Sequence, residues 1–311
     1  MKLLLQIKNK PLLQRLLLIV AFFNIYIIWG STYLAVILGL KGFPPFILVG
    51  LRYLIAGIIL LTYTKAKGEK FPPQKLLLKQ ALSGILMLVG GTGMIAWAEQ
   101  YITSGQAAIL VATEPLWFLL LDRKRWPEYF SSKFIVLGLI AGFAGIFLFL
   151  KAARLQVNYS QIGLTATFVV LLSTVWWVLG SLLINNNRGK SSVMMNSSVQ
   201  LLAAGIVSGL IAVFTGEISD FSFKNVPVNS WLALLFLIVF ASLLAYLSFI
   251  WLMTKKPLAI ISTHTYVNPV VAVFLGWLFL NEQLVKGQIA GLLIILIGIV
   301  LVNVPAYRRA T

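Results

Sequence analysis

Residues 97–115 of this chain, WAEQYITSGQAAILVATEP, recur in altered form 154 positions later as residues 251–269, WLMTKKPLAIISTHTYVNP. At this offset Trp97 aligns with Trp251, and Pro115 aligns with Pro269. A repeat at half the chain length indicates that the chain consists of two related halves. In apolar chains this arrangement is typical of membrane proteins in which two helical bundles surround a central site.

The composition is that of a protein embedded in lipid. Of 311 residues, 60% are hydrophobic and 11% are charged, which is too few charged residues for the surface of a soluble protein of this size. The apolar residues occur in long blocks, as in helices surrounded by lipid. An outer-membrane barrel is excluded, because its strands alternate apolar and polar residues. The sequence therefore predicts an all-α membrane protein.

The net charge of +17 does not indicate nucleic-acid binding, because the basic residues fall at the predicted helix ends and form no continuous face. The chain has no cysteine and one histidine, and it has no Walker motif. We therefore expect no metal site, no cofactor and no ATP binding. The first apolar run is about 25 residues long, too long for the core of a signal peptide, so we expect a retained helix.

Ten apolar blocks reach the length of about 20 residues that a helix needs to cross a bilayer. Prolines at their boundaries, such as Pro44 and Pro72, act as helix breakers. Gly138 and Gly142 form a small-xxx-small pattern, which predicts close helix packing. The predicted helices cover residues 16–40, 45–64, 77–97, 104–121, 133–150, 161–184, 194–214, 230–253, 258–280 and 287–304.

The charges in the loops indicate the orientation. With ten helices, both termini lie on one side, and 19 of the 25 Lys and Arg residues fall on that side. Five fall on the other side, and Arg52 lies within the second predicted helix. By the positive-inside rule, we expect both termini in the cytoplasm and the protein in the cytoplasmic membrane.

Each half contains five predicted helices, so the second half must enter the membrane in the opposite direction. The repeat is therefore predicted to be inverted. This divides the chain into a cytoplasmic N-terminus, a first repeat, an extracytoplasmic linker, a second repeat and a cytoplasmic C-terminus. These segments cover residues 1–15, 16–150, 151–160, 161–304 and 305–311.

Several motifs are shared with a known family. They are IWGSTY at residues 28–33, RYLIAG at 52–57, QYITSGQAA at 100–108, and Asn268-Pro269 followed by NEQ at 281–283. Over nearly the whole chain, the sequence resembles the EamA family of the drug/metabolite transporter superfamily. The resemblance implies ten helices in two inverted five-helix repeats. It also implies a transporter that exports amino acids, small metabolites or drug-like compounds.

On this basis we expect a secondary transporter that works by alternating access. Its expected partners are a small-molecule substrate and the lipid bilayer. The resemblance and the helix count leave the oligomeric state open between a monomer and a homodimer.

Polar groups inside the membrane are costly, and they are therefore candidates for function. Glu114 lies ten residues into the fourth predicted helix, about 15 Å deep at 1.5 Å per residue, and it precedes the helix-breaking Pro115. Its carboxylate can carry a proton or bind a substrate amine. The alternative is a structural ion pair with Arg52, which lies at a similar depth. We expect Arg52, Pro115 and Pro269 to be structural.

His264 and Asn268 are one helical turn apart and share a face of the ninth predicted helix. Asn268 aligns with Glu114 across the repeat, so we expect both beside the substrate. His264 is the second candidate for proton coupling, because imidazole titrates near neutral pH. The alternative is a histidine held by a carbonyl or hydroxyl group of a neighbouring helix.

Aromatic residues are numerous, with nine Trp in the chain. Most Trp and Tyr residues in membrane helices lie at the interface or serve packing. A cavity with aromatic walls and the Glu114 carboxylate would suit an amphiphilic or aromatic amino compound. The aromatic residues expected at this cavity are Tyr26, Trp29, Trp97, Trp117, Trp176 and Trp177.

Two other functional classes are weaker alternatives. A membrane-embedded enzyme needs a nucleophile–base pair or a cluster of metal ligands at helical spacing, and the sequence offers neither, so we predict no catalytic residue. A passive pore or facilitator is compatible with the same helices. It differs from a secondary transporter in that its flux does not saturate steeply and shows no exchange with counter-substrate.

Overall fold

The computed structural model describes residues 11–123, 126–154, 161–185, 192–219, 221–256, 258–283 and 285–308. Parts of the predicted N-terminus, linker and C-terminus, namely residues 1–10, 155–160 and 309–311, lie outside the described residues. Within the described ranges all regular structure is helical and no strand occurs. The predicted all-α class is therefore confirmed.

The first half forms five helical rods, three of which change geometry or break along their length. Residues Asn24–Ile28 and Ile85–Gly93 are π-helical turns inside longer helices. The elements are α2 (Pro11–Phe23), η1 (Asn24–Ile28), α3 (Trp29–Leu40), α4 (Pro45–Ala66), α5 (Gln74–Gly84), η2 (Ile85–Gly93), α6 (Met94–Ala98), α7 (Ser104–Val111), α8 (Glu114–Leu121), α9 (Trp126–Phe130) and α10 (Lys133–Arg154).

The second half follows the same order. A third π-helical segment, η5, again lies inside the third rod of its half. The elements are α11 (Gln161–Asn185), α12 (Val193–Phe214), η4 (Phe223–Asn225), α13 (Val228–Phe236), η5 (Leu237–Ala245), α14 (Tyr246–Lys255), α15 (Leu258–Ile261), α16 (His264–Leu280) and α17 (Lys286–Arg308).

Local sequence signals set the helix starts. Pro45 occupies the first turn of α4, where its missing N–H costs nothing. At α7 the Thr103 side chain accepts from the backbone N–H of Gln106, and the Gln106 side chain accepts from the N–H of Thr103. This reciprocal capping box fixes the point at which the chain turns back into the bundle.

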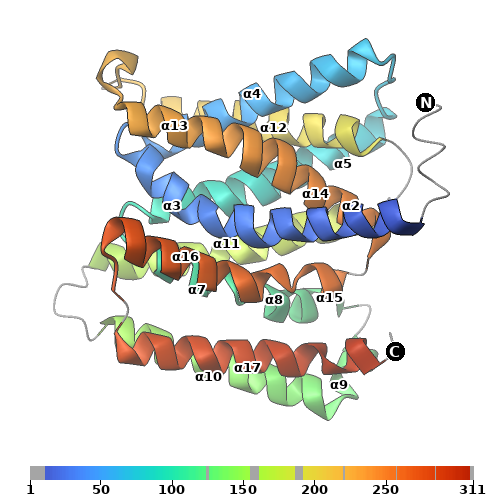
Figure 1. Cartoon of the computed structure of the whole chain (residues 1–311), viewed down its shortest axis with the longest axis vertical. Coiled ribbons are helices and arrows are strands. Elements are labelled where there is room, and N and C mark those ends of the chain that lie inside the picture. The colour runs from blue at the N-terminus through green and yellow to red at the C-terminus, as the bar shows by residue number, and fades with distance from the viewer. Residues whose placement is uncertain are drawn as a thin grey trace.

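The helices run roughly parallel or antiparallel to one another, and the start of α2 and the end of α17 lie at the same end of the bundle (Figure 1). Eight helical runs within the described residues are long and apolar enough to cross a membrane. Two further apolar helices, His264–Leu280 and Lys286–Val302, are shorter. The predicted ninth helix is short because a break at residues 262–263 separates α15 from α16.

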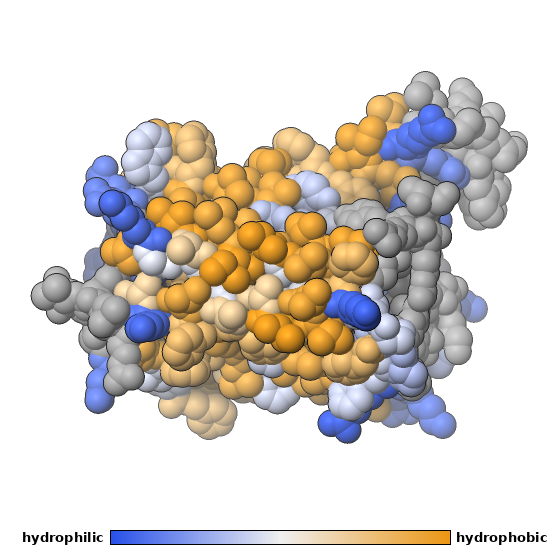
Figure 2. Space-filling view, turned by 90° about the horizontal axis from the view of Figure 1, so that it is seen from below, coloured by the Kyte–Doolittle hydropathy of each residue, from blue (hydrophilic) through white to orange (hydrophobic). Residues whose placement is uncertain are grey.

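The outer surface matches a lipid environment. On the face that carries α10 and α17, hydrophobic residues cover the middle and hydrophilic residues gather at the two ends (Figure 2). Large apolar side chains such as Phe147 and Ile297 are exposed there, at 66% and 57%. Water would not favour this surface, whereas lipid does. The protein is thus a multi-pass membrane protein.

The two halves pack against each other through corresponding helices. The last helix of the first half, α10, packs along the last helix of the second, α17, and α4 packs along α12 (Figure 1). The first helix of the second half, α11, contacts η2 and α7 of the first. In the same way α3, in the first helix of the chain, contacts α13 and α16 of the second half.

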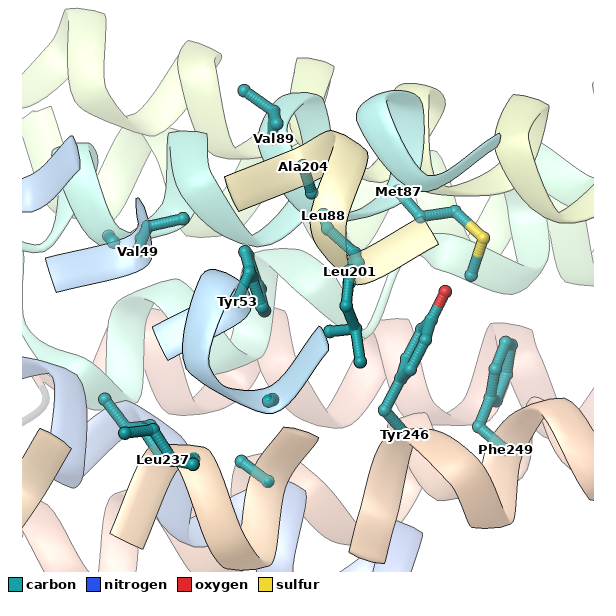
Figure 3. Packing of buried hydrophobic residues seen from close by; sticks show 14 of the residues in the cluster. Val49, Tyr53, Met87, Leu88, Val89, Leu201, Ala204, Leu237, Tyr246 and Phe249 are labelled. Carbon is teal, nitrogen blue, oxygen red and sulfur yellow. The ribbon is translucent and has the colours of Figure 1, made fainter. Parts of the chain in front are cut away.

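The interior contains two hydrophobic clusters. The first joins α4, η2, α12, η5 and α14, and includes Tyr53, Leu201, Tyr246 and Phe249. Figure 3 shows Tyr246 and Phe249 projecting from α14 towards the helix that carries Leu201. The second cluster joins α7, α8, α10 and α17. A cavity lies where the two clusters meet, since it is lined by Trp177 of the first and Tyr33 of the second.

Candidate functional site

The cavity between the two hydrophobic clusters has a volume of about 80 Å³. Helices from both halves line it, and five of the residues predicted from the sequence to bind substrate face it together. These five are Trp29, Glu114, Trp177, His264 and Asn268.

Glu114 stands directly after a break in its helix. Helix α7 ends at Val111, residues 112–113 form a turn, and α8 starts at Glu114 with Pro115 in its first turn. Pro115 therefore occupies the position that tolerates a proline best. The Glu114 side chain is 3% exposed, and it lies at the positive end of the α8 dipole, which favours its negative charge.

His264 occupies the same place in the second half. Residues 262–263 form a turn, and α16 starts at His264. The two helix breaks thus pair Glu114 with His264, whereas the offset of the sequence repeat pairs it with Asn268. Nε2 of His264 lies 4.0 Å from Oε2 of Glu114, and both side chains are 3% exposed.

The hydrogen-bond partner of Nδ1 of His264 determines which tautomer faces Glu114. Nδ1 lies 2.9 Å from the carbonyl oxygen of Ile261. A carbonyl only accepts, so Nδ1 carries a hydrogen and Nε2 is the nitrogen that gains or loses a proton. The nitrogen of His264 that gains or loses a proton is therefore the one that faces Glu114.

Asn268 ties α16 to the π-helical segment of the first helix. With its amide nitrogen turned towards the acceptors around it, Asn268 donates to the carbonyl oxygens of Tyr26 at 2.8 Å, Ile25 at 3.0 Å and His264 at 3.1 Å. The wide turn of η1 leaves carbonyl groups without their usual helical donors. The π-helical segment thus supplies acceptors that fix Asn268 at the cavity wall.

An aromatic group forms another wall. The rings of Trp29 and Trp177 meet edge to face at 5.5 Å, and the ring of Phe249 lies 5.2 Å from Trp29. Trp29 also lies 5.3 Å from the imidazole of His264. Its indole nitrogen donates to the carbonyl of Ala241 in η5 at 3.4 Å. Aromatic faces of this kind suit apolar chains and cationic groups.

Near this wall, Oε1 of Glu114 and Nε1 of Trp177 are buried and make no hydrogen bond of ordinary geometry with the described residues. The Trp177 side chain still lies close enough to the Glu114 carboxylate for the two to interact.

Arg52 also lines the cavity. The sequence offered Glu114 as its ion-pair partner, but in the structure Arg52 binds another residue. Nε of Arg52 donates to Oγ of Ser242 at 2.8 Å, which links α4 to η5. The guanidinium lies 4.9 Å from the ring centre of Tyr53. Although both side chains are described, Arg52 forms no ion pair with Glu114, which faces His264 instead. Its bond to Ser242 agrees with a structural role, and its position leaves the cation beside the cavity.

Four aromatic residues predicted at the cavity lie elsewhere. The Tyr26 hydroxyl bonds to Oγ1 of Thr263 at 2.6 Å, one residue from His264. Trp97 packs against Tyr101. Trp117 donates to Thr113 at 3.1 Å and packs against Phe143 of α10, facing away from the cavity. Trp176 packs next to Gly90 of η2.

One acidic residue escaped the sequence argument. Glu99 lies within the repeated stretch, two residues after Trp97, and it lines the same cavity as Glu114. The repeat replaces it with Met253. This asymmetry was the available signal, but Glu99 lies at the predicted helix end, where a carboxylate is ordinarily solvated.

Two further carboxylates join the halves at the end of the bundle that carries the loop at residues 99–103. Glu282 accepts from the N–H groups of Ser104 and Gly105 at 3.0 and 3.2 Å, and from Oγ of Ser104 at 2.7 Å. Glu217 accepts from the N–H groups of Phe46 and Ile47 at 2.9 and 3.0 Å. Each caps the start of a first-half helix.

Among the described residues, no three His, Cys, Asp or Glu side chains come together in a way that could hold a metal ion.

Comparison with known proteins identifies the family. The model of the EamA-like transporter family matches residues 16–151 and again residues 164–304. The chain belongs to this family. It is 35% identical to the uncharacterized inner membrane transporter YedA of Escherichia coli, over 92% of this chain and 90% of YedA. It is 26% identical to the uncharacterized transporter YoaV of Bacillus subtilis, over 92% and 96% of the two chains.

A solved structure agrees with the fold. A crystal structure of a protein with 18% sequence identity superposes with a TM-score of 0.64, covering 94% of this chain and 98% of the other. At this identity the likeness concerns the fold alone.

Proposed function

We propose that this EamA-family protein is a secondary transporter that exports small amino compounds across the cytoplasmic membrane. In this proposal ten helices form two inverted repeats, residues 16–150 and 161–304, with both termini in the cytoplasm. The repeats move relative to each other, so that the cavity opens alternately to the two sides.

The contacts between the halves support the inverted repeat. Exchanging each helix for its counterpart turns the α11–η2 contact into η1–η5, and the α11–α8 contact into α3–α16, and all four contacts occur. The contacts α4–α12 and α10–α17 map onto themselves. A two-fold pseudo-axis in the membrane plane produces this pattern, and the family model matches the chain once in each half.

Further support comes from matched irregularities. The π-helical segments Ile85–Gly93 and Leu237–Ala245 occupy the third helix of their halves. The helix breaks at residues 112–113 and 262–263 both lie beside the cavity. Broken helices at the centre of two repeats are the usual location of substrate and coupling ions in secondary transporters.

The chemistry of the cavity supports an amino compound as substrate. Glu114 supplies a carboxylate for a substrate ammonium group, and Arg52 supplies a guanidinium for a substrate carboxylate. Trp29 and Trp177 supply apolar contact for the rest of the molecule. The single observation that carries the proposal is that Glu114 and Arg52 line one cavity without forming an ion pair with each other.

The size of the cavity favours a small substrate in this conformation. A volume of about 80 Å³ compares with the ~10–15 Å³ that one water molecule requires. The cavity therefore has room for several water molecules in this conformation. Drug-sized molecules need pockets of about 300 Å³ or more.

The Glu114–His264 pair is the proposed site of proton coupling. A proton and a substrate ammonium group compete for the same carboxylate, so that binding of one releases the other. This competition is the basis of proton–substrate exchange.

The capping carboxylates support alternating access. Glu217 and Glu282 of the second half are hydrogen-bonded to first-half helices at one end of the bundle. Glu217 follows Gly216, and Glu69 follows Gly68, and both glycines have positive φ angles of 76° and 74°. Glu69 is therefore the counterpart of Glu217 at the opposite end, yet its buried Oε2 has no hydrogen-bond partner among the described residues. In this proposal, Glu217 and Glu282 hold the two halves together on the extracytoplasmic side, and Glu69 does not do so on the cytoplasmic side.

Purified protein in proteoliposomes provides the test. A panel of labelled amino acids and amines is screened for counter-substrate exchange at two pH values, with Glu114→Gln beside the wild type. We expect saturable exchange of small amino compounds by the wild type and a loss of its pH dependence in Glu114→Gln. The proposal fails if no member of the panel is exchanged, or if flux rises linearly with concentration as in a passive pore.

A further inference from the structure

Glu99 is a buried carboxylate that the structure leaves unbound. It is the residue that follows the last turn of α6, it lies in the cavity wall, and it is 5% exposed. Neither of its carboxylate oxygens has a hydrogen-bond partner among the described residues. Burying an unpaired carboxylate is costly, and a merely structural carboxylate would have its oxygens occupied.

The contrast with its neighbour Glu282 is direct. The two carboxylates are close enough to interact electrostatically. The oxygens of Glu282 accept hydrogen bonds from two backbone N–H groups and one hydroxyl, so this carboxylate caps the start of α7. Glu99 receives no such donors, and the negative charge of Glu282 makes its position still more favourable for a cation.

The groups facing Glu99 supply no cation to neutralise it. Tyr33 lies within electrostatic reach of both Glu99 and Glu114. Arg52 is on the same cavity, but its Nε is bound to Ser242 and it forms no ion pair with Glu99. Within the described residues, Glu99 is therefore a free acceptor pointing at the space that the substrate would occupy.

With both carboxylates ionised, as bound cations would hold them, the charges of the cavity add up to an excess of one negative charge. Arg52 contributes one positive charge, Glu99 one negative charge, and the Glu114–His264 pair one negative charge when it holds no proton. An amino acid with a neutral side chain neutralises Arg52 and Glu114 and leaves Glu99 unpaired. A molecule with one carboxylate and two ammonium groups neutralises all three.

We propose that Glu99 binds the second cationic group of a dibasic amino acid whose α-ammonium lies at Glu114 and whose carboxylate lies at Arg52. This inference rests on the proposed function. The start of α7, beside Glu99, lies ten residues before Glu114, about 15 Å along the helix axis at 1.5 Å per residue. Glu99 and Glu114 line the same cavity, so a lysine-like chain that lies in it can place one cation at each carboxylate.

The test compares lysine with norleucine, which has the same chain without the ε-ammonium group. Exchange of each is measured in proteoliposomes for the wild type, Glu99→Gln and Glu99→Asp. We expect the wild type to prefer lysine. The lysine-to-norleucine ratio of exchange rates should fall at least about tenfold in Glu99→Gln, because a cation then faces an uncharged amide, and Glu99→Asp should retain a preference for lysine.

Glu217→Gln is the matched control, because it neutralises a carboxylate at the same end of the bundle outside the cavity lining, and it should keep the wild-type ratio. Equal exchange of lysine and norleucine by the wild type, or an unchanged ratio in Glu99→Gln, overturns the inference. If Glu99→Gln does not fold, a lysine preference in the wild type that Glu99→Asp abolishes overturns it as well. If no amino compound is exchanged at all, the proposed function fails instead.

Discussion

Nε2 of His264 and Oε2 of Glu114 face each other across 4.0 Å at the two helix breaks of the protein. The other imidazole nitrogen is held by the carbonyl of Ile261, so the proton that comes and goes lies on the side of Glu114. The distance exceeds a direct hydrogen bond and leaves room for a small movement or a bridging water. This pair is where we expect proton and substrate to compete.

Glu114→Gln tests this competition. Glutamine keeps the size of the side chain and one oxygen acceptor, but it holds no exchangeable proton. We expect flux driven by a pH gradient to fall at least about tenfold, because the substrate ammonium also loses its buried counter-charge. The measurement is uptake of a substrate identified by the screen, with and without an imposed pH gradient. Unaltered pH dependence in Glu114→Gln would contradict the coupling role.

His264→Gln and Glu217→Gln complete that experiment. His264→Gln removes the proton acceptor beside Glu114 but leaves the carboxylate in place. We expect exchange between substrate molecules to survive in this variant, while the response to the pH gradient weakens. Glu217→Gln lies outside the cavity lining, so a change in the helix cap should alter both fluxes alike and leave the ratio of flux with the pH gradient to flux without it as in the wild type.

The packing of α10 against α17 gives a second prediction. A Cβ atom at Gly298 would lie 2.6 Å from the backbone nitrogen of Gly142 and 2.7 Å from the carbonyl oxygen of Gly138. Backbone atoms cannot move aside without separating the helices, so we expect Gly298→Ala to destabilise the protein by about 1–3 kcal/mol. Thermal unfolding in detergent measures this as a lower apparent melting temperature.

Gly209→Ala is the matched control. Gly209 also lies within a helix, α12, but a Cβ atom there would meet nothing within 4 Å. Alanine is the better helix former by up to about 1 kcal/mol, so this variant should melt at or above the wild-type temperature. Equal effects of the two substitutions would show that the glycines of α10 and α17 do not determine the packing.

Hydrophobic blocks and glycine spacing were sufficient to predict the fold class and most helices. Gly138 and Gly142 pack against α17, as their small-xxx-small spacing predicts. This spacing can be read from the sequence alone. The break before His264 was not predictable in the same way. Pro269 aligns with Pro115, but the turn forms at residues 262–263, six residues before Pro269, and Pro269 lies inside α16.

The candidate site was predictable where charge lies deep in a helix, and less so elsewhere. Glu114, His264 and Asn268 stand out because polar groups are rare in such apolar segments. Glu99 lies at a helix end, and only its burial distinguishes it from a solvated residue. Trp117 lies three residues after Glu114 in the same helix, α8, but its indole bonds to Thr113 and packs against Phe143, which the spacing alone does not determine.

A buried polar chain in the first hydrophobic cluster gives a third prediction. The hydroxyl of Tyr246, a residue that is 2% exposed, donates to Oε1 of Gln200 at 2.6 Å, and Nε2 of Gln200 donates to Oε1 of Gln80 at 2.5 Å. Tyr246→Phe leaves Oε1 of Gln200 buried without this donor. We expect a loss of about 1 kcal/mol, within the range of hydrogen bonds in membrane proteins and of buried unsatisfied acceptors.

Thermal unfolding of Tyr246→Phe is compared with that of Tyr63→Phe. Tyr63 is 44% exposed, and its ring rather than its hydroxyl contacts Lys67. Its replacement should leave the melting temperature within experimental error. A Tyr246→Phe variant that melts as the wild type would indicate that Gln200 finds another donor.

Glu217 gives a prediction about pH outside the membrane-spanning segments. Partial burial raises the pKa of Glu217 above its usual value, and the N–H groups of Ile47 and Phe46 lower it again only in part. The folded protein therefore binds the proton of Glu217 more tightly than the unfolded chain does. By linkage, the contribution of this group to stability is fully present below the unfolded pKa, about 4.3, and is lost as pH rises through the higher folded pKa.

Glu217→Gln and Glu217→Ala separate the charge of this carboxylate from its role as a helix cap. Glutamine still offers an acceptor to α4 and carries no charge, so the melting temperature of the wild type minus that of Glu217→Gln should decrease between about pH 4 and pH 7. Alanine removes the acceptor at every pH, so Glu217→Ala should be less stable than Glu217→Gln by about 1 kcal/mol throughout, which is the usual cost of a lost helix cap. Other carboxylates cancel in these differences as long as they lie far from Glu217. A difference that increases with pH would mean that the two N–H donors outweigh burial, so that the charged form is the one that holds α4.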